Sequence, residues 1–226
     1  MLQNLKIPDV VTLSNALFGL AAIVVASNGR YGLACILLLM AAVADGVDGY
    51  LARRLGGSDL GGTMDSLADV ISFGVAPAFI VYSAYSAQHL YLISAAVSFY
   101  VICGILRLAR FSSIQKTVTD FEGLPITAGS VMIVSYLLID AKYISAYSVV
   151  ALVVILSLLM ISTFTYPKFS NIRTMAPVSV MFGLVIPSFF IKIEYTTSFS
   201  MILFIAMAIY VASPVVKTNK IFNKEM

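Results

Sequence analysis

Four aspartates form two closely spaced pairs in one stretch of an otherwise apolar chain. Asp45 and Asp48 are spaced i, i+3, and Asp65 and Asp69 are spaced i, i+4. Each spacing places both carboxylates of a pair on one face of a helix. The segment between the pairs is short and rich in glycine, so the two helices are expected to be antiparallel neighbours. All four carboxylates can then converge on one small volume.

Carboxylates this close together repel each other unless they are protonated or bind cations. Aspartate supplies the hard oxygen ligands that Mg²⁺, Mn²⁺ and Ca²⁺ prefer. Such a set can hold two divalent ions about 3.5–4 Å apart, the arrangement that enzymes use for displacement at phosphorus. The stretch therefore predicts a site for two divalent ions, Mg²⁺, Mn²⁺ or Ca²⁺, that acts on a phosphate ester.

Other residues of the stretch favour a phosphorylated substrate. Arg53 adds a fixed positive charge, and Gly49 leaves room for a substrate against the helix backbone. Asp59 is off the pattern, and we expect it to be a solvated loop residue. Two other interpretations stay open. The acids could be a solvated helix end, or they could form the site of a cation transporter, which would leave Arg53 without a purpose.

The composition predicts a membrane protein. The chain is 60% hydrophobic and 11% charged, whereas a soluble domain is about half apolar and about a quarter charged. Apolar runs of about 20 residues predict transmembrane helices. We expect an all-α integral membrane protein with one membrane-embedded catalytic domain, residues 1–226, and about eight transmembrane helices. The expected helices are residues 10–29, 31–52, 66–86, 88–106, 124–141, 143–164, 175–191 and 198–214.

The distribution of basic residues predicts the orientation in the cell membrane. With eight spans, both termini lie on one side, and of the 14 lysines and arginines only Arg30, Lys142 and Lys192 fall on the opposite side. Short loops rich in Lys and Arg stay in the cytoplasm. We therefore expect a multi-pass protein whose N-terminus, C-terminus and aspartate pairs are cytoplasmic.

The scarcity of histidine and cysteine disfavours several other classes of site. The chain has one histidine, His89, and its two cysteines, Cys35 and Cys103, lie inside apolar runs. A histidine triad, a histidine-rich metal site and a disulfide framework are therefore not expected.

The aspartate stretch resembles the signature of the CDP-alcohol phosphotransferase family. That signature is Asp-x2-Asp-Gly-x2-Ala-Arg, a spacer of about eight residues, and Gly-x3-Asp-x3-Asp. The matching residues here are Asp45, Asp48, Gly49, Ala52, Arg53, Gly61, Asp65 and Asp69. The spacer, residues 54–60, has seven residues and is one shorter than the family pattern.

Four further segments resemble the phosphatidylserine synthase branch of that family, which includes archaeal enzymes that use an ether lipid. They are SLADVISFGVAPA (66–78), RLARF (107–111), FEGLPITAG (121–129) and YPKFSN (166–171). The resemblance implies transfer of a phosphatidyl-type group from a CDP-diacylglycerol or CDP-archaeol type lipid to L-serine, with release of CMP. It also implies a homodimer among membrane lipids, without a nucleic-acid partner. A sibling enzyme that uses glycerol phosphate or inositol phosphate is the alternative.

The resemblance implies roles for individual residues. Asp45, Asp48, Asp65 and Asp69 would bind the two ions, and Asp69 would also be the general base for the serine hydroxyl. Candidates for contacts with the CDP-lipid are Gly49, Arg53, Ser58, Gly61, Asp9, Thr12 and Asn15. The last three could instead cap and pack their own helix. Candidates for the serine carboxylate are Arg110, Arg107 and Lys168, which could instead be topology determinants.

Overall fold

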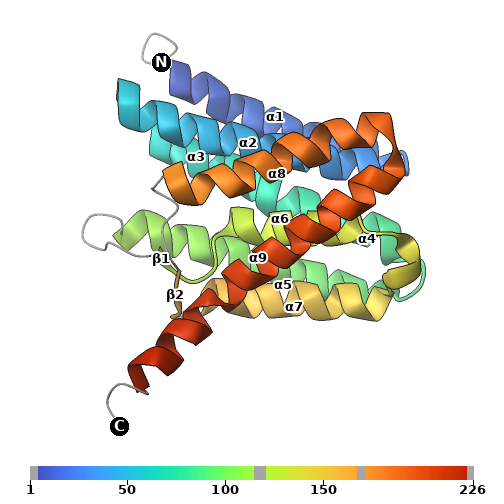
Figure 1. Ribbon diagram of the computed structural model, residues 1–226. Coiled ribbons are helices and arrows are strands. Elements are labelled where there is room, and N and C mark those ends of the chain that lie inside the picture. Colours follow the sequence, from blue (N-terminus) through green and yellow to red (C-terminus); the bar gives the residue numbers. More distant parts are fainter. Residues whose placement is uncertain (1–4, 115–120, 167–171, 223–226) are drawn as a thin grey trace.

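The computed structural model describes residues 5–114, 121–166 and 172–222. It is almost entirely helical (Figure 1). In chain order the elements are α1 (Ile7–Ser27), α2 (Tyr31–Leu55), α3 (Gly61–Asp69), the π-helix η2 (Val70–Val75), α4 (Ala76–Tyr85), α5 (Leu90–Ile114), β1 (Phe121–Glu122), α6 (Ile126–Leu137), the 3₁₀ turn η3 (Ala141–Tyr143), α7 (Ala146–Ile161), β2 (Thr165–Tyr166), α8 (Ile172–Ile191) and α9 (Ile193–Phe222). β1 and β2 form a short antiparallel pair.

The helices match the eight predicted spans, because α3, η2 and α4 follow one another without a break from Gly61 to Tyr85. In the described part of the chain, five helices are long and apolar enough to cross a membrane: Ile7–Ser27, Tyr31–Leu55, Gly61–Tyr85, Leu90–Ser112 and Glu194–Pro214. The third span begins at residue 61 rather than at the predicted residue 66. Its first turn is polar and glycine-rich, so the apolar run alone did not reveal it.

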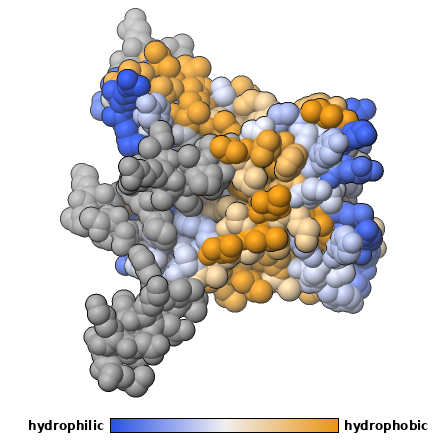
Figure 2. Space-filling model, in the orientation of Figure 1, coloured by the Kyte–Doolittle hydropathy of each residue, from blue (hydrophilic) through white to orange (hydrophobic). Residues whose placement is uncertain are grey.

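The surface has the distribution expected for a protein that spans a bilayer. Figure 2 shows an apolar band across the middle of the visible face, with polar residues at both ends of the helices. The shorter helix α6 is buried along almost its whole length and packs against α2, α5, α7 and α9. Because its neighbours surround it, α6 does not have to cover the full membrane thickness by itself.

A π-turn follows the last of the four aspartates and packs against α1. The Ala76 N–H donates to the Ile71 carbonyl, which is the i→i+5 bond of a π-helix. The Ser72 hydroxyl donates to the Asn15 carbonyl of α1 at 2.9 Å. The Tyr100 hydroxyl of α5 donates to the Phe73 carbonyl at 3.0 Å. The turn is thus fixed from two sides, and with it the helix that carries the second aspartate pair.

The close approach of α1 to the π-turn requires a glycine. A Cβ atom on Gly19 would lie 2.7 Å from the Ser72 Cα, a backbone atom that cannot rotate away. We predict that Gly19→Ala separates α1 from η2 and lowers the free energy of unfolding by about 1–3 kcal/mol. Thermal unfolding in detergent measures the change.

The matched control for this prediction is Gly183→Ala in α8, where a Cβ atom meets nothing within 4 Å. In a helix interior this substitution should leave stability unchanged or raise it by up to about 1 kcal/mol. Equal unfolding temperatures for the Gly19→Ala and Gly183→Ala variants would contradict the packing argument.

Candidate active site

Three carboxylates from two helices meet near the ends of α2 and α3. Asp45 and Asp48 of α2 and Asp65 of α3 each offer an oxygen atom, and these atoms all lie within 4.8 Å of one another. Asp48 is 4% exposed, and the other two are half-buried. The sharp connection between the helices starts at Gly56, whose φ of +82° is readily adopted by glycine. The structure therefore brings both aspartate pairs to one place.

Asp69 lies one helical turn beyond Asp65 and is 7% exposed. Its side chain interacts electrostatically with those of Asp45, Asp65 and Asp48. Its Oδ1 accepts a hydrogen bond from the Asn15 Nδ2 at 3.5 Å. Asp69 thus borders the group of three carboxylates without belonging to it, a position suited either to a second ion or to proton transfer.

The donor set fits a divalent cation. Mg²⁺, Mn²⁺ and Ca²⁺ prefer carboxylate oxygens, and Asp45, Asp48 and Asp65 supply three of them. The Asp48 Oδ2 is buried and has no hydrogen-bond partner among the described residues. Such an atom is costly to bury without a partner. A cation bound between the three carboxylates would satisfy it and would remove their mutual repulsion.

The polar face of α1 contacts the aspartates. Thr12 lies close to Asp48, and its hydroxyl donates to the Pro8 carbonyl at 3.1 Å. Asn15, one turn further along α1, contacts Asp69. These two side chains therefore lie against Asp48 and Asp69, where the sequence analysis expected contacts with a nucleotide or packing within the helix.

Asp9 holds the start of α1 and the loop before α3. Its Oδ2 accepts from the Lys6 N–H at 2.7 Å, which caps the helix. Its Oδ1 accepts from the Ser58 hydroxyl at 3.0 Å. A Cβ atom on Gly61 would lie 3.2 Å from the same Oδ1, so glycine lets α3 begin close to α1. The shortened spacer is thus fastened to the first helix.

The basic residues on α5 have different environments. Arg107 is 7% exposed, interacts electrostatically with Asp69, Asp45 and Asp65, and stacks over Phe111 at 5.2 Å from the ring centroid. The two terminal nitrogens of Arg110 instead donate to the Ser162 and Ile161 carbonyls at the end of α7, at 3.3 Å each. Lys168 lies outside the described residues.

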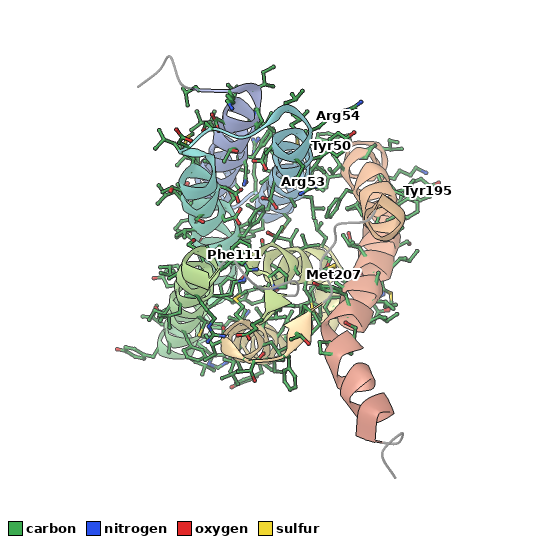
Figure 3. The ribbon with its side chains drawn as sticks, turned by 90° about the vertical axis from the view of Figure 1, so that its left-hand side faces the viewer. Tyr50, Arg53, Arg54, Phe111, Tyr195 and Met207 are labelled. Atoms are coloured by element: carbon green, nitrogen blue, oxygen red, sulfur yellow. The ribbon has the colours of Figure 1, made fainter. Side chains whose placement is uncertain are left out.

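Arg53 lies at the exposed edge of the site. In Figure 3, which looks onto this end of the molecule, Arg53 on α2 lies above Phe111 on α5. A Cβ atom on Gly49 would be 3.5 Å from the Arg53 Nη1, so the guanidinium lies along its own helix over the glycine. An exposed guanidinium with this freedom can turn toward a phosphate that enters the site.

One contact was missed by reasoning from the sequence. The Thr127 hydroxyl, in the first turn of α6, donates to the Asp45 Oδ2 at 3.4 Å. Thr127 is 82 residues from Asp45 in the chain, so no spacing rule connects them. The FEGLPITAG segment, which contains Thr127, was the one available signal.

Comparisons with known proteins agree with this geometry. A sequence model of the CDP-alcohol phosphatidyltransferase family matches residues 5–161, which include all four aspartates. The archaetidylserine synthase of Methanothermobacter thermautotrophicus is 39% identical over 73% of this chain and 70% of its own length. A CDP-diacylglycerol–serine O-phosphatidyltransferase of Methanocaldococcus jannaschii is 40% identical over 74% of this chain and 76% of its own. The protein of that name from Helicobacter pylori is 38% identical over 74% and 73%.

The cluster predicts a metal-dependent gain in stability. Mn²⁺ at about 100 times its Kd should stabilise the wild-type protein by about 2.7 kcal/mol. Asp48→Asn should lose most of this gain, because it replaces a ligand, while its metal-free form should be at least as stable as the wild type, because a repulsion is relieved. Thermal unfolding with and without Mn²⁺ measures both effects.

Asp59→Asn is the control, since Asp59 is exposed in the loop between the two aspartate pairs. It should keep the full response to Mn²⁺. An Asp48→Asn protein that responds to Mn²⁺ as the wild type does would remove Asp48 from the metal site.

Proposed function

The chain belongs to the CDP-alcohol phosphatidyltransferase family, and on this premise we propose that it is the serine-specific enzyme, a phosphatidylserine synthase in the broad sense. It transfers a phosphatidyl-type group from a CDP-linked lipid to the hydroxyl of L-serine and releases CMP. The convergence of Asp45, Asp48, Asp65 and Asp69 carries the proposal for the chemistry. The names of the relatives, which are 38–40% identical to this chain, support serine as the acceptor.

The proposed reaction is a displacement at the phosphorus atom that carries the lipid. The serine hydroxyl oxygen forms the new bond to this phosphorus, the bond from phosphorus to the CMP oxygen breaks, and the hydroxyl proton passes to Asp69. Two divalent ions at the four aspartates would neutralise the charge of the pyrophosphate and of the departing CMP. The carboxylates come from α2 and α3 and would hold the ions against the reacting phosphate group, while Asn15 of α1 donates a hydrogen bond to Asp69.

The proposed contacts with the nucleotide and with the serine carboxylate are inferred from the position and charge of the residues around the aspartates. Arg53 and Gly49 lie at the exposed edge, where the nucleotide phosphates would bind, and Ser58 and Gly61 lie in the loop and at the start of α3, against Asp9 of α1. For the serine carboxylate we propose Arg107, because it is buried next to the cluster. Arg110 is less suited, since its guanidinium already caps α7.

Arg107 also bears on the choice of acceptor. A phosphorylated acceptor such as glycerol phosphate or inositol phosphate brings about two negative charges, whereas serine brings one carboxylate together with an ammonium group. The surroundings of Arg107 are rich in carboxylates. These carboxylates would be neutralised by the bound ions, so the single guanidinium of Arg107 would match the one carboxylate of serine and would leave the charge of a phosphate partly unmatched. A homodimer belongs to the same proposal and is supported by the family resemblance alone.

The site end of the bundle is proposed to face the cytoplasm. Lys6 precedes α1, Arg53 and Arg54 end α2, and Arg107 and Arg110 lie in the last part of α5 at this end. The opposite ends of the helices carry Arg30, Lys142 and Lys192 among the described residues. The richer basic side is the cytoplasmic one under the positive-inside rule.

The acceptor is tested with purified protein, Mn²⁺ or Mg²⁺, and a CDP-lipid. L-serine, glycerol phosphate and inositol phosphate are supplied separately, and release of CMP is measured. We expect CMP with serine and at least about 100-fold less with the other two acceptors, because they leave charges unmatched in the site. Running the assay with both an ester and an ether CDP-lipid identifies the lipid class. Turnover with inositol phosphate but not with serine would overturn the proposal that serine is the acceptor. No release of CMP with any acceptor would overturn the proposal that the protein is an enzyme of this kind.

The orientation is tested by labelling single cysteines with a membrane-impermeant maleimide. Both native cysteines, Cys35 and Cys103, are buried and should not react. Asp59→Cys places a thiol in the exposed loop of the site, and Lys142→Cys places one at the exposed opposite end. In intact cells only Lys142→Cys should react, and Asp59→Cys should react after permeabilisation. The reverse pattern would place the site outside the cell.

A further inference from the structure

Asn15 lies on α1, next to Asp69 of the site, and its side chain is completely buried. It is 0% exposed. Its Nδ2 donates to the Asp69 Oδ1 at 3.5 Å, and its backbone carbonyl accepts from the Ser72 hydroxyl at 2.9 Å. Its Oδ1 is buried and has no hydrogen-bond partner among the described residues. An asparagine at a purely structural position would not leave half of its amide unsatisfied, because this costs free energy that an apolar residue avoids.

The backbone at Asn15 is fixed relative to Asp69. The Ser72 hydroxyl holds the Asn15 carbonyl, and Gly19, one turn later on α1, touches the same serine. Ser72 in turn lies three residues after Asp69, at the start of the π-turn. The donor and the carboxylate are therefore carried by two segments that are in direct contact and hydrogen-bonded to each other. The short asparagine side chain then has little freedom to leave Asp69.

The direction of the amide follows from charge. Only the NH₂ group of an asparagine can donate to a carboxylate, and the opposite orientation would place two acceptors against each other. The distance of 3.5 Å is long for a hydrogen bond. Hydrogen bonds to catalytic groups are often long in the absence of substrate and tighten when it binds. The Asn15 NH₂ group thus points toward Asp69, and we expect this hydrogen bond to shorten when the substrates bind.

We propose that Asn15 is a positioning residue for Asp69 in the phosphatidyl transfer. Its NH₂ group holds one carboxylate oxygen, so that the other oxygen is aimed at the serine hydroxyl. This inference rests on the proposed function, in which Asp69 takes the hydroxyl proton. It differs from a contact between Asn15 and cytidine, because a positioning residue acts on the rate of the chemical step, whereas a nucleotide contact acts on binding of the CDP-lipid.

The test compares variants of Asn15 in the assay of CMP release with serine. Asn15→Leu has a similar shape and lacks the donor. We expect it to lower kcat about 10- to 100-fold, the range for loss of a hydrogen bond to a charged group. The KM for the CDP-lipid should stay within about threefold of the wild type, since ground-state binding is not affected. A packing role alone would not separate kcat from KM in this way.

Asn15→Asp is the second variant and keeps the size and polarity of the side chain. It loses the donor and faces Asp69 with a like charge, so kcat should fall at least as far as in Asn15→Leu. The matched control is Asn28→Asp, because Asn28 is exposed at the far end of α1 and its side-chain NH₂ group donates to the Val24 carbonyl at 2.8 Å. This control should keep the wild-type kcat. If Asn15→Leu does not fold, the pair Asn15→Asp and Asn28→Asp decides the question.

Each outcome has a distinct meaning. Unchanged kcat in the folded Asn15 variants would overturn the positioning role while the proposed function stands. A raised KM for the CDP-lipid with unchanged kcat would overturn it in favour of a cytidine contact. Wild-type protein that releases no CMP would overturn the proposed function instead. The Mn²⁺ concentration needed for thermal stabilisation then tests the contact alone: at least about threefold more for Asn15→Leu supports it, and an unchanged requirement contradicts it.

Discussion

Repulsion among buried carboxylates is the constraint on which the rest of this structure depends. Asp45, Asp48 and Asp65 come within 4.8 Å of one another at the end of a helix bundle whose neighbours are largely apolar. In such surroundings like charges interact more strongly than in water. The helices must therefore be held together by packing elsewhere, and the charges must be balanced locally. Arg107 supplies part of this balance, and a bound divalent cation would supply the rest.

Contacts with α1 help to hold the two aspartate-bearing helices together. Along one face of α1, Asp9 accepts a hydrogen bond from the loop before α3, Thr12 lies close to Asp48, and Asn15 donates to Asp69. One turn after Asn15, the same face of α1 carries Gly19, and the π-turn packs against the helix there. This order of polar residues followed by glycine places α1 against both aspartate helices. A change on α1 is therefore expected to act on the rate of the reaction as well as on stability.

The location of the site suits a reaction between a water-soluble amino acid and a membrane lipid. The aspartates lie toward the end of the bundle where α2 ends and α3 begins, and Figure 2 shows an apolar band across the middle of the molecule. Arg53 is exposed at this end, where the proposed nucleotide contact would be open to water. The acyl or isoprenoid chains of the lipid can stay in the apolar band, where they lose no contact with the membrane. Neither substrate then has to leave its own solvent completely.

The sequence alone determined the parts of this protein that depend on local rules. Hydropathy gave the eight helices, and the i, i+3 and i, i+4 spacings gave the convergence of Asp45, Asp48 and Asp65, because both follow from the geometry of one helix or of two helices in succession. Only the tertiary structure decided which distant residues support the site. The contact between Thr127 and Asp45 spans 82 residues, and that between Asn15 and Asp69 spans 54. It also separated Arg107, which faces the cluster, from Arg110, which caps α7. These contacts depend on how helices rotate and pack against one another, and no spacing within a single helix encodes that rotation.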